Sequence, residues 1–237
     1  MDFGEDSELD GWANYFENLA TPQDLPQFDN EHFGAQEIRN LLLHETLPMV
    51  TAPEVTEEQM RKDISSLKNG KAIDYMGLTA EHVKFASPKI VKLLTQLVNS
   101  IMLASRLPDQ LRPGLITPIL KKGKDGRDPD SYRRITVSPI LGKFLEKEML
   151  RRTRQSIKHE PLQFGFTERC SSTTCAFIIT EAVAEAMDLG HPLYISFLDA
   201  KKAFDLVSHT NMLGSLFNEG LEAPLWRMYA DIYSHIT

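Results

Sequence analysis

The chain has 237 residues, of which 42% are hydrophobic and 25% are charged, a balance typical of a folded globular protein with a sizeable core. No apolar run reaches the roughly 18 residues of a membrane-spanning helix, and the acidic N-terminus lacks the basic start of a signal peptide. Cys170 and Cys175 form neither a zinc pattern nor a disulfide framework, so we expect free thiols in an intracellular protein of the nucleus or cytoplasm.

The net charge of −7 is unevenly distributed, and residues 1–50 are strongly acidic. Residues 1–60 carry 14 acidic side chains and one basic side chain, Arg39, which gives this segment a charge of −13. Short amphipathic pieces lie near Trp12–Leu19 and Glu37–Leu43. We expect loosely packed helices or partial disorder in residues 1–50.

The first clear helix signal is the capping box Thr56-Glu-Glu-Gln59, which predicts a helix with one apolar face that runs to Gly70. Ser87-Pro88 opens a second, long apolar helix that ends near Ser105, because proline is tolerated in a first helical turn.

A basic hairpin is predicted next. Leu115–Leu120 and Tyr132–Val137 are strand-like runs, and Lys121–Asp130 is a loop rich in glycine, aspartate and proline. Residues 118–154 hold 11 basic and 5 acidic side chains, a net charge of +6. A phosphate-binding surface requires such a concentration, although a solvated helix face explains the charge equally well.

Further helices are predicted after Ser138-Pro139, Ser171, Ser208 and Pro224. In the first of these, apolar residues should face inward and basic residues mostly outward. The inward set is Leu141, Phe144, Leu145 and Met149, and the outward set is Lys143, Lys147, Arg151, Arg152 and Arg154.

The stretch from Leu193 to His209 organises the rest of the chain. An apolar run predicts a buried strand at residues 193–199 that ends in a carboxylate, Asp199. A carboxylate in that place is costly to desolvate unless a cation or hydrogen-bond donors meet it. From the residues alone, a turn or helix-capping aspartate is the more ordinary interpretation.

Taken whole, Phe197-Leu-Asp-Ala-Lys-Lys-Ala-Phe-Asp-Leu-Val-Ser-His209 resembles the first palm motif of reverse transcriptases from non-LTR (LINE-like) retrotransposons. The hairpin with Tyr132-Arg-Arg-Ile135, the run Gln163-Phe-Gly-Phe166 and the segment Lys68–His82 resemble other motifs of this family. The resemblance covers about residues 55–237. It departs from the family at Arg134, where the family has proline, and at Ile73–Gly77, which keeps only the last glycine of a Pro-Gly-Pro-Asp-Gly turn.

The resemblance implies an α+β fold of the right-hand polymerase (reverse-transcriptase-like) type. It implies an acidic N-terminal segment at 1–50, a fingers region at 51–190 and a partial palm at 191–237. In this interpretation the chain is truncated before the hairpin that carries the family's carboxylate pair.

The resemblance also assigns roles to residues. Asp199 is the implied catalytic residue and ligand of Mg²⁺, and Lys121 and Arg133 are implied to grip the nucleotide triphosphate. Ala200 and Phe204 complete the implied nucleotide-binding set, while Asp205 is taken as structural. The implied partners are an RNA template, a DNA primer and deoxynucleoside triphosphates.

Two functions stay open at this point. The first is a fragment of an RNA-directed DNA polymerase that is inactive as it stands, because polymerase chemistry needs divalent ions held by several carboxylates. Tyr229-Ala-Asp-Ile232 does not supply them, since its apolar spacing is helical. The alternative is a non-catalytic, domesticated or decayed nucleic-acid-binding module.

Overall fold

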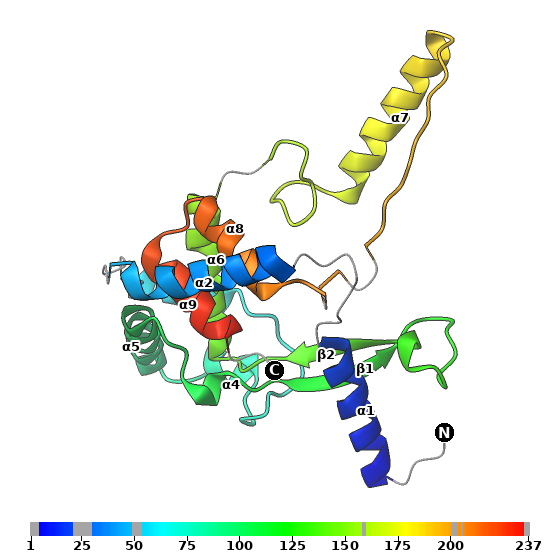
Figure 1. Ribbon diagram of the computed structural model, residues 1–237. Helices are drawn as coiled ribbons and strands as arrows, with labels where there is room; N and C mark the ends of the chain where they lie inside the picture. Colours follow the sequence, from blue (N-terminus) through cyan, green and yellow to red (C-terminus); the bar gives the residue numbers. More distant parts are fainter. Residues whose placement is uncertain are drawn as a thin grey trace.

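A computed structural model of the chain describes residues 5–20, 30–48, 54–157, 160–200, 203–204 and 206–234. This described part is mostly helical and contains one antiparallel hairpin of two strands (Figure 1). The helices are α1 (Glu5–Ala20), α2 (Asn30–Thr46), α3 (Glu57–Ser65), α4 (Ala80–Lys84), α5 (Lys89–Ala104), α6 (Gly142–Ser156), α7 (Ser172–Asp188), α8 (His209–Asn218) and α9 (Ala223–Tyr233). The strands are β1 (Leu115–Leu120) and β2 (Tyr132–Val137), and short 3-10 turns lie at Asp109–Leu111 and Pro129–Ser131.

One apolar core joins α3, α5, α6, α8 and α9. Its largest fully buried side chains include Trp226, Phe144 and Met60, which come from three different helices. The indole Nε1 of Trp226 donates a hydrogen bond of 2.8 Å to the backbone oxygen of Leu213. The buried aromatic ring therefore keeps its polar atom satisfied while it links α9 to α8.

Helices form over both amphipathic pieces of the acidic N-terminal segment. α2 packs along α8, where the Nη2 atom of Arg39 donates to the Oδ1 atom of Asn218 at 2.7 Å and the Nδ2 atom of Asn40 donates to the Thr210 oxygen at 2.8 Å. Leu43 and Leu47 pack against the apolar core. α2 is therefore part of the helical body, although its sequence is polar and acidic.

The local signals at helix starts are confirmed. The side chains of Thr56, Ser171 and Ser208 each accept a hydrogen bond from the backbone N–H three residues later, as N-caps do. The helix after Ser138-Pro139 begins later than predicted, at Gly142. Arg152, expected on the outer face of that helix, is instead buried because it pairs with Glu148 at 2.6 Å.

The predicted hairpin is confirmed with the predicted strand ends. Leu115 pairs with Val137 at its root, and Leu120 pairs with Tyr132 next to the loop. Arg134, which replaces the family's proline, lies opposite Pro118. Pro118 is compatible with its place in β1, because each strand of a two-stranded sheet has one free edge where no backbone N–H is needed.

The predicted buried strand at residues 193–199 is wrong. These residues have no strand partner, and Tyr194 and Leu198 are 91% and 98% exposed. Figure 1 shows that α7 and the segment after it extend away from the helical body. A strand requires a neighbour for its backbone hydrogen bonds, and the only sheet in the described part is the β1–β2 hairpin.

The carboxylate of Asp74 connects the turn at residues 73–78 to the start of α6. Its Oδ1 atom accepts hydrogen bonds from the N–H groups of Met76 (3.0 Å) and Leu78 (2.8 Å), and its Oδ2 atom accepts one from Ile140 (2.8 Å). Gly77 adopts φ +77°, a conformation that glycine reaches without steric cost. Asp74 is 4% exposed, so these bonds form in a site with little access to water.

We predict that Asp74→Ala lowers the free energy of unfolding by about 2–4 kcal/mol, because a buried N–H of Ile140 loses its acceptor and two turn N–H groups lose theirs. The measurement is urea unfolding followed by circular dichroism. Glu185→Ala, an exposed carboxylate of α7, is the matched control and should change stability by less than about 0.5 kcal/mol. Equal stability of the two variants would contradict the prediction.

Candidate nucleic-acid interface

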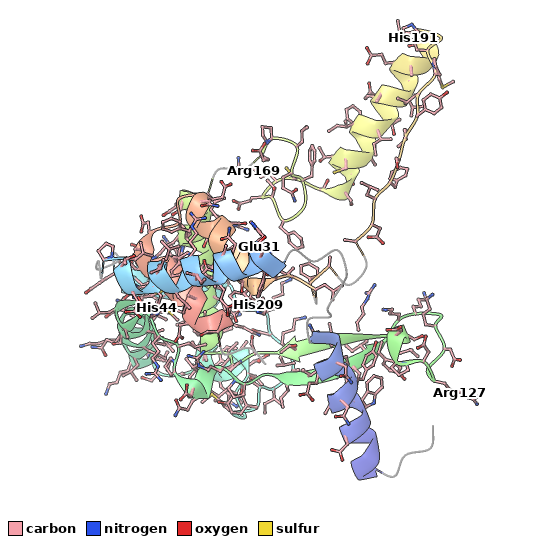
Figure 2. All side chains as sticks on the ribbon, in the orientation of Figure 1. Glu31, His44, Arg127, Arg169, His191 and His209 are labelled. Carbon is pink, nitrogen blue, oxygen red and sulfur yellow. The ribbon has the colours of Figure 1, made fainter. Side chains whose placement is uncertain are left out.

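The loop at the tip of the hairpin is ordered by its own acidic side chains. The Oδ1 atom of Asp125 accepts a hydrogen bond from the Arg127 N–H at 2.9 Å, and that of Asp128 accepts one from the Asp130 N–H at 3.0 Å. These are the short-range turns that aspartate favours. The loop's basic side chains Lys122, Lys124 and Arg127 are exposed, and Figure 2 shows Arg127 at the tip, pointing outward.

Lys121 and Arg133 lie close together at the loop end of the two strands. The Lys121 N–H donates to the Ser131 oxygen at 2.9 Å, which extends the strand pairing by one residue beyond Leu120 and Tyr132. Arg133 pairs with Ile119. Lys121 and Arg133 are therefore diagonal neighbours on one face, a relation that places Cβ atoms roughly 7–8 Å apart. The Nζ atom of Lys121 is held by the Asp130 backbone oxygen at 2.7 Å.

α1 packs against the other face of the hairpin. Side chains alternate along a strand, so Tyr132 faces away from the side of Arg133. The ring of Trp12 meets the ring of Tyr132 at 4.8 Å, and the Tyr15 hydroxyl donates to the Oδ1 atom of Asp130 at 2.6 Å. Phe16 is buried beside them. An acidic helix thus lies against the face of the hairpin opposite Arg133, and Figure 1 shows α1 next to the strands.

The basic residues of α6 are largely engaged in internal pairs. Arg151 contacts Asp63 at 3.0 Å and also pairs with Glu148, while the Nζ atom of Lys147 donates to the Asp63 backbone oxygen at 3.0 Å. Partial burial lowers the pKa of Lys147, with Asp63 opposing and Arg151 reinforcing that shift. The charge of +6 on residues 118–154 therefore overstates what this helix can offer to a ligand.

The residues that the palm resemblance selects are exposed. Asp199 and Ala200 lie at the end of the extended segment, and Phe204 is 79% exposed. The Phe204 ring meets the Phe166 ring edge-on at 6.1 Å, so the palm-like motif contacts the Gln163–Phe166 motif. Asp205 lies outside the described residues.

The described residues do not fit the magnesium site that the resemblance implies. Within the described ranges, no group of three or more histidine, cysteine, aspartate or glutamate side chains is placed to hold a metal ion. Magnesium uses few protein ligands, but those ligands must be carboxylates that converge on the ion. Asp199 by itself provides one.

Asp231 has a structural position. It lies in α9, which confirms the helical interpretation of Tyr229–Ile232, and its Oδ2 atom accepts hydrogen bonds from the Leu107 N–H at 2.8 Å and the Arg112 Nη2 atom at 2.7 Å. Cys170 and Cys175 are free thiols, as predicted.

The sequence interpretation missed one feature, a cavity of about 310 Å³ at the root of the hairpin, which we call the lysine cavity. Its lining includes Lys68 and Lys71 from the loop after α3 and Lys143 and Lys147 from α6. The spacing of four between Lys143 and Lys147 indicated a shared helix face. Nothing in the sequence indicated that the loop would lie opposite this face.

Comparison with known proteins gives a distant relation. The chain is 29% identical over 188 residues to the RNA-directed DNA polymerase from mobile element jockey of Drosophila funebris, which covers 76% of this chain and 20% of the relative. It is 27% identical over 148 residues to the probable RNA-directed DNA polymerase from transposon X-element of Drosophila melanogaster (61% of this chain, 16% of the relative). It is also 27% identical over 164 residues to the retrovirus-related Pol polyprotein from retrotransposable element R2DM of that species (68% and 15%).

The chain is thus similar to non-LTR retrotransposon reverse transcriptases over part of their length, and it spans about a fifth or less of these relatives. No family model matches it. In the part of the chain that the structure describes, none of the helices has the length and apolar character needed to cross a membrane.

Proposed function

We propose that this chain supplies the fingers region of an RNA-directed DNA polymerase of the non-LTR retrotransposon type and contacts nucleic-acid phosphates through its basic hairpin. The observation that carries the proposal is the placement of Lys121 and Arg133 as diagonal neighbours, next to a loop whose basic side chains are exposed. The similarity to RNA-directed DNA polymerases is the reason to propose a nucleic acid as the ligand of this surface.

The chemistry of the two residues suits phosphate. Arginine presents a planar fork of N–H donors that matches two phosphate oxygens, and lysine adds a compact charge. The bond from Lys121 to the Asp130 oxygen uses one donor of the ammonium group and orients it, leaving further N–H donors for a ligand. Lys121 is therefore pre-positioned, whereas Arg133 is exposed and adjusts to the phosphate.

Within this proposal, a contact between two motifs supports the assigned role of Phe204. The contact between Phe204 and Phe166 brings together two segments that separately resemble the polymerase family. The implied roles of Asp199 in catalysis and metal binding, and of Ala200 and Phe204 in nucleotide binding, rest on that resemblance.

A second candidate function is a nucleic-acid-binding module without catalysis. The exposed position of Asp199, with no metal-binding cluster among the described residues, favours this candidate for the 237-residue chain by itself. Both candidates use the same hairpin surface, and neither of them predicts polymerase activity for this chain by itself.

We predict weak, sequence-independent binding of single-stranded RNA that falls steeply with salt. If the hairpin and its neighbours make three to five phosphate contacts, log affinity should change with log salt with a slope of roughly −2 to −3.5. Changing both Lys121 and Arg133 to Ala should weaken binding and reduce the slope by about 1.4. Fluorescence anisotropy with a labelled RNA across a salt series measures both quantities.

The matched control changes Lys92 and Arg106 to Ala, since these exposed cations lie on and just after α5, away from the hairpin. This variant should bind RNA with nearly the affinity and salt slope of the unaltered protein, apart from the small general effect of losing two positive charges. Salt-independent binding, or equal losses in the two double variants, would remove the hairpin from the proposed interface.

Removing residues 1–29 should tighten RNA binding several-fold at low salt. This segment carries eight acidic and no basic side chains, and its helix α1 lies directly behind the hairpin. The truncation retains α2, which packs on α8. Asp10→Asn with Glu17→Gln keeps the aromatic contacts and should produce a smaller tightening in the same anisotropy assay. Weaker RNA binding by the truncated protein, with an unchanged melting curve, would contradict the prediction and show that α1 holds the hairpin in its binding conformation.

The 237-residue chain should not extend a primer on an RNA or DNA template with Mg²⁺ or Mn²⁺. The expectation follows from the exposed Asp199 and the missing metal cluster in the described ranges. Gel analysis of labelled primers provides the measurement, with Asp199→Ala as the comparison. Template-dependent extension that is lost in Asp199→Ala would establish the polymerase and exclude the non-catalytic module.

A further inference from the structure

The lysine cavity lies between two segments that are far apart in sequence, residues 66–80 and 137–147. Its walls come from the loop after α3, from the end of β2 at Val137 and Ser138, and from the first turns of α6. The strands of the hairpin are six residues long, so this cavity lies about 20 Å from the hairpin tip. It is a separate place from the Lys121 and Arg133 surface.

The lining of the cavity is strongly basic. Lys68, Lys71, Lys143 and Lys147 contribute four positive charges, and Asp74 is the acidic residue among the lining side chains. Both oxygens of Asp74 accept backbone N–H groups, so they point into the protein framework. The four lysines therefore line a cavity in which the carboxylate of Asp74 already uses both oxygens in hydrogen bonds.

One of the lysines is held in a fixed orientation. The Nζ atom of Lys147 donates to the Asp63 backbone oxygen and to the Ser66 hydroxyl. Lys143 lies one helical turn earlier, on the same face of α6. Ser138 also lines the cavity and brings a hydroxyl group that can donate to an anion, whereas the Ser66 hydroxyl already donates to the Asp63 oxygen at 2.8 Å.

We propose that the lysine cavity binds a phosphate group. Like charges around one cavity repel each other, and a phosphate, with a charge of about −1 in a nucleic-acid diester and about −2 in a free monoester, reduces that repulsion while it accepts hydrogen bonds from the ammonium groups. The phosphate comes from one of two sources: the backbone of a nucleic acid that also contacts the hairpin, or a free phosphate compound. The first source rests on the proposed function, and the second does not.

The pKa of Lys147 is lowered by partial burial, which Asp63 opposes and Arg151 reinforces, so the ammonium group lies in a partly desolvated place. An anion in the cavity would favour the charged form of Lys147. Arg151 is itself paired with Asp63 and Glu148.

The first experiment measures how fast each lysine is acylated, read by mass spectrometry, with and without inorganic phosphate. Sodium chloride of equal ionic strength is the reference, since salt alone screens charge. Phosphate should slow the acylation of Lys71 and Lys143 several-fold and leave Lys92, exposed on α5, unchanged. Isothermal titration of phosphate should show binding about tenfold weaker for Lys71→Gln with Lys143→Gln, and unaltered binding for Lys92→Gln.

The second experiment repeats the acylation with a short single-stranded RNA. Protection by RNA but not by inorganic phosphate identifies the nucleic-acid backbone as the source, and protection by phosphate alone identifies a free compound. Protection that persists in the Lys121→Ala, Arg133→Ala protein shows that the cavity acts independently of the hairpin. If neither ligand protects Lys71 and Lys143, or if the glutamine variants bind phosphate as well as the unaltered protein, the proposal is overturned.

Discussion

The carboxylate of Asp74 is the interaction on which the arrangement of the basic surfaces depends. It binds the turn at residues 73–78 to the Ile140 N–H, at the point where the chain passes from β2 into α6. That one contact sets the distance between the loop of Lys68 and Lys71 and the helix face of Lys143 and Lys147. It also fixes the root of the hairpin, and the bonds from Lys147 to Asp63 and Ser66 join α6 to the end of α3 beside the cavity.

Net charge along the sequence is a poor guide to the charge that a ligand meets. Residues 118–154 carry +6, but Arg151 and Arg152 neutralise Asp63 and Glu148 inside the protein. In the hairpin loop the acidic side chains do not neutralise the basic ones. Asp125 and Asp128 accept hydrogen bonds from backbone N–H groups, and the basic side chains of the loop stay exposed. The surface cations are thus concentrated at the hairpin tip and around the cavity, at opposite ends of β2.

The features that the sequence predicted are those set by neighbours in the chain. Helix caps at Thr56, Ser171 and Ser208 and the hairpin at residues 115–137 depend on contacts a few residues apart, or on one loop. The strand at 193–199 depends on a partner strand from elsewhere, which local pattern cannot supply, and it did not form in the described part. The lysine cavity was missed for the same reason, since its two pairs of lysines meet through long-range contacts of the Asp74 turn and of Lys147 with Asp63 and Ser66.

The hairpin itself explains why an acidic helix lies so close to a basic surface. A two-stranded sheet is marginally stable by itself, and here apolar side chains such as Ile116, Ile119 and Ile135 are about half exposed. α1 covers part of the Tyr132 face, where Trp12 meets Tyr132, and leaves the face of Arg133 open. Under the proposed function, α1 has two opposite effects on RNA binding: its acidic charge should repel phosphate, whereas its aromatic contacts should support the hairpin.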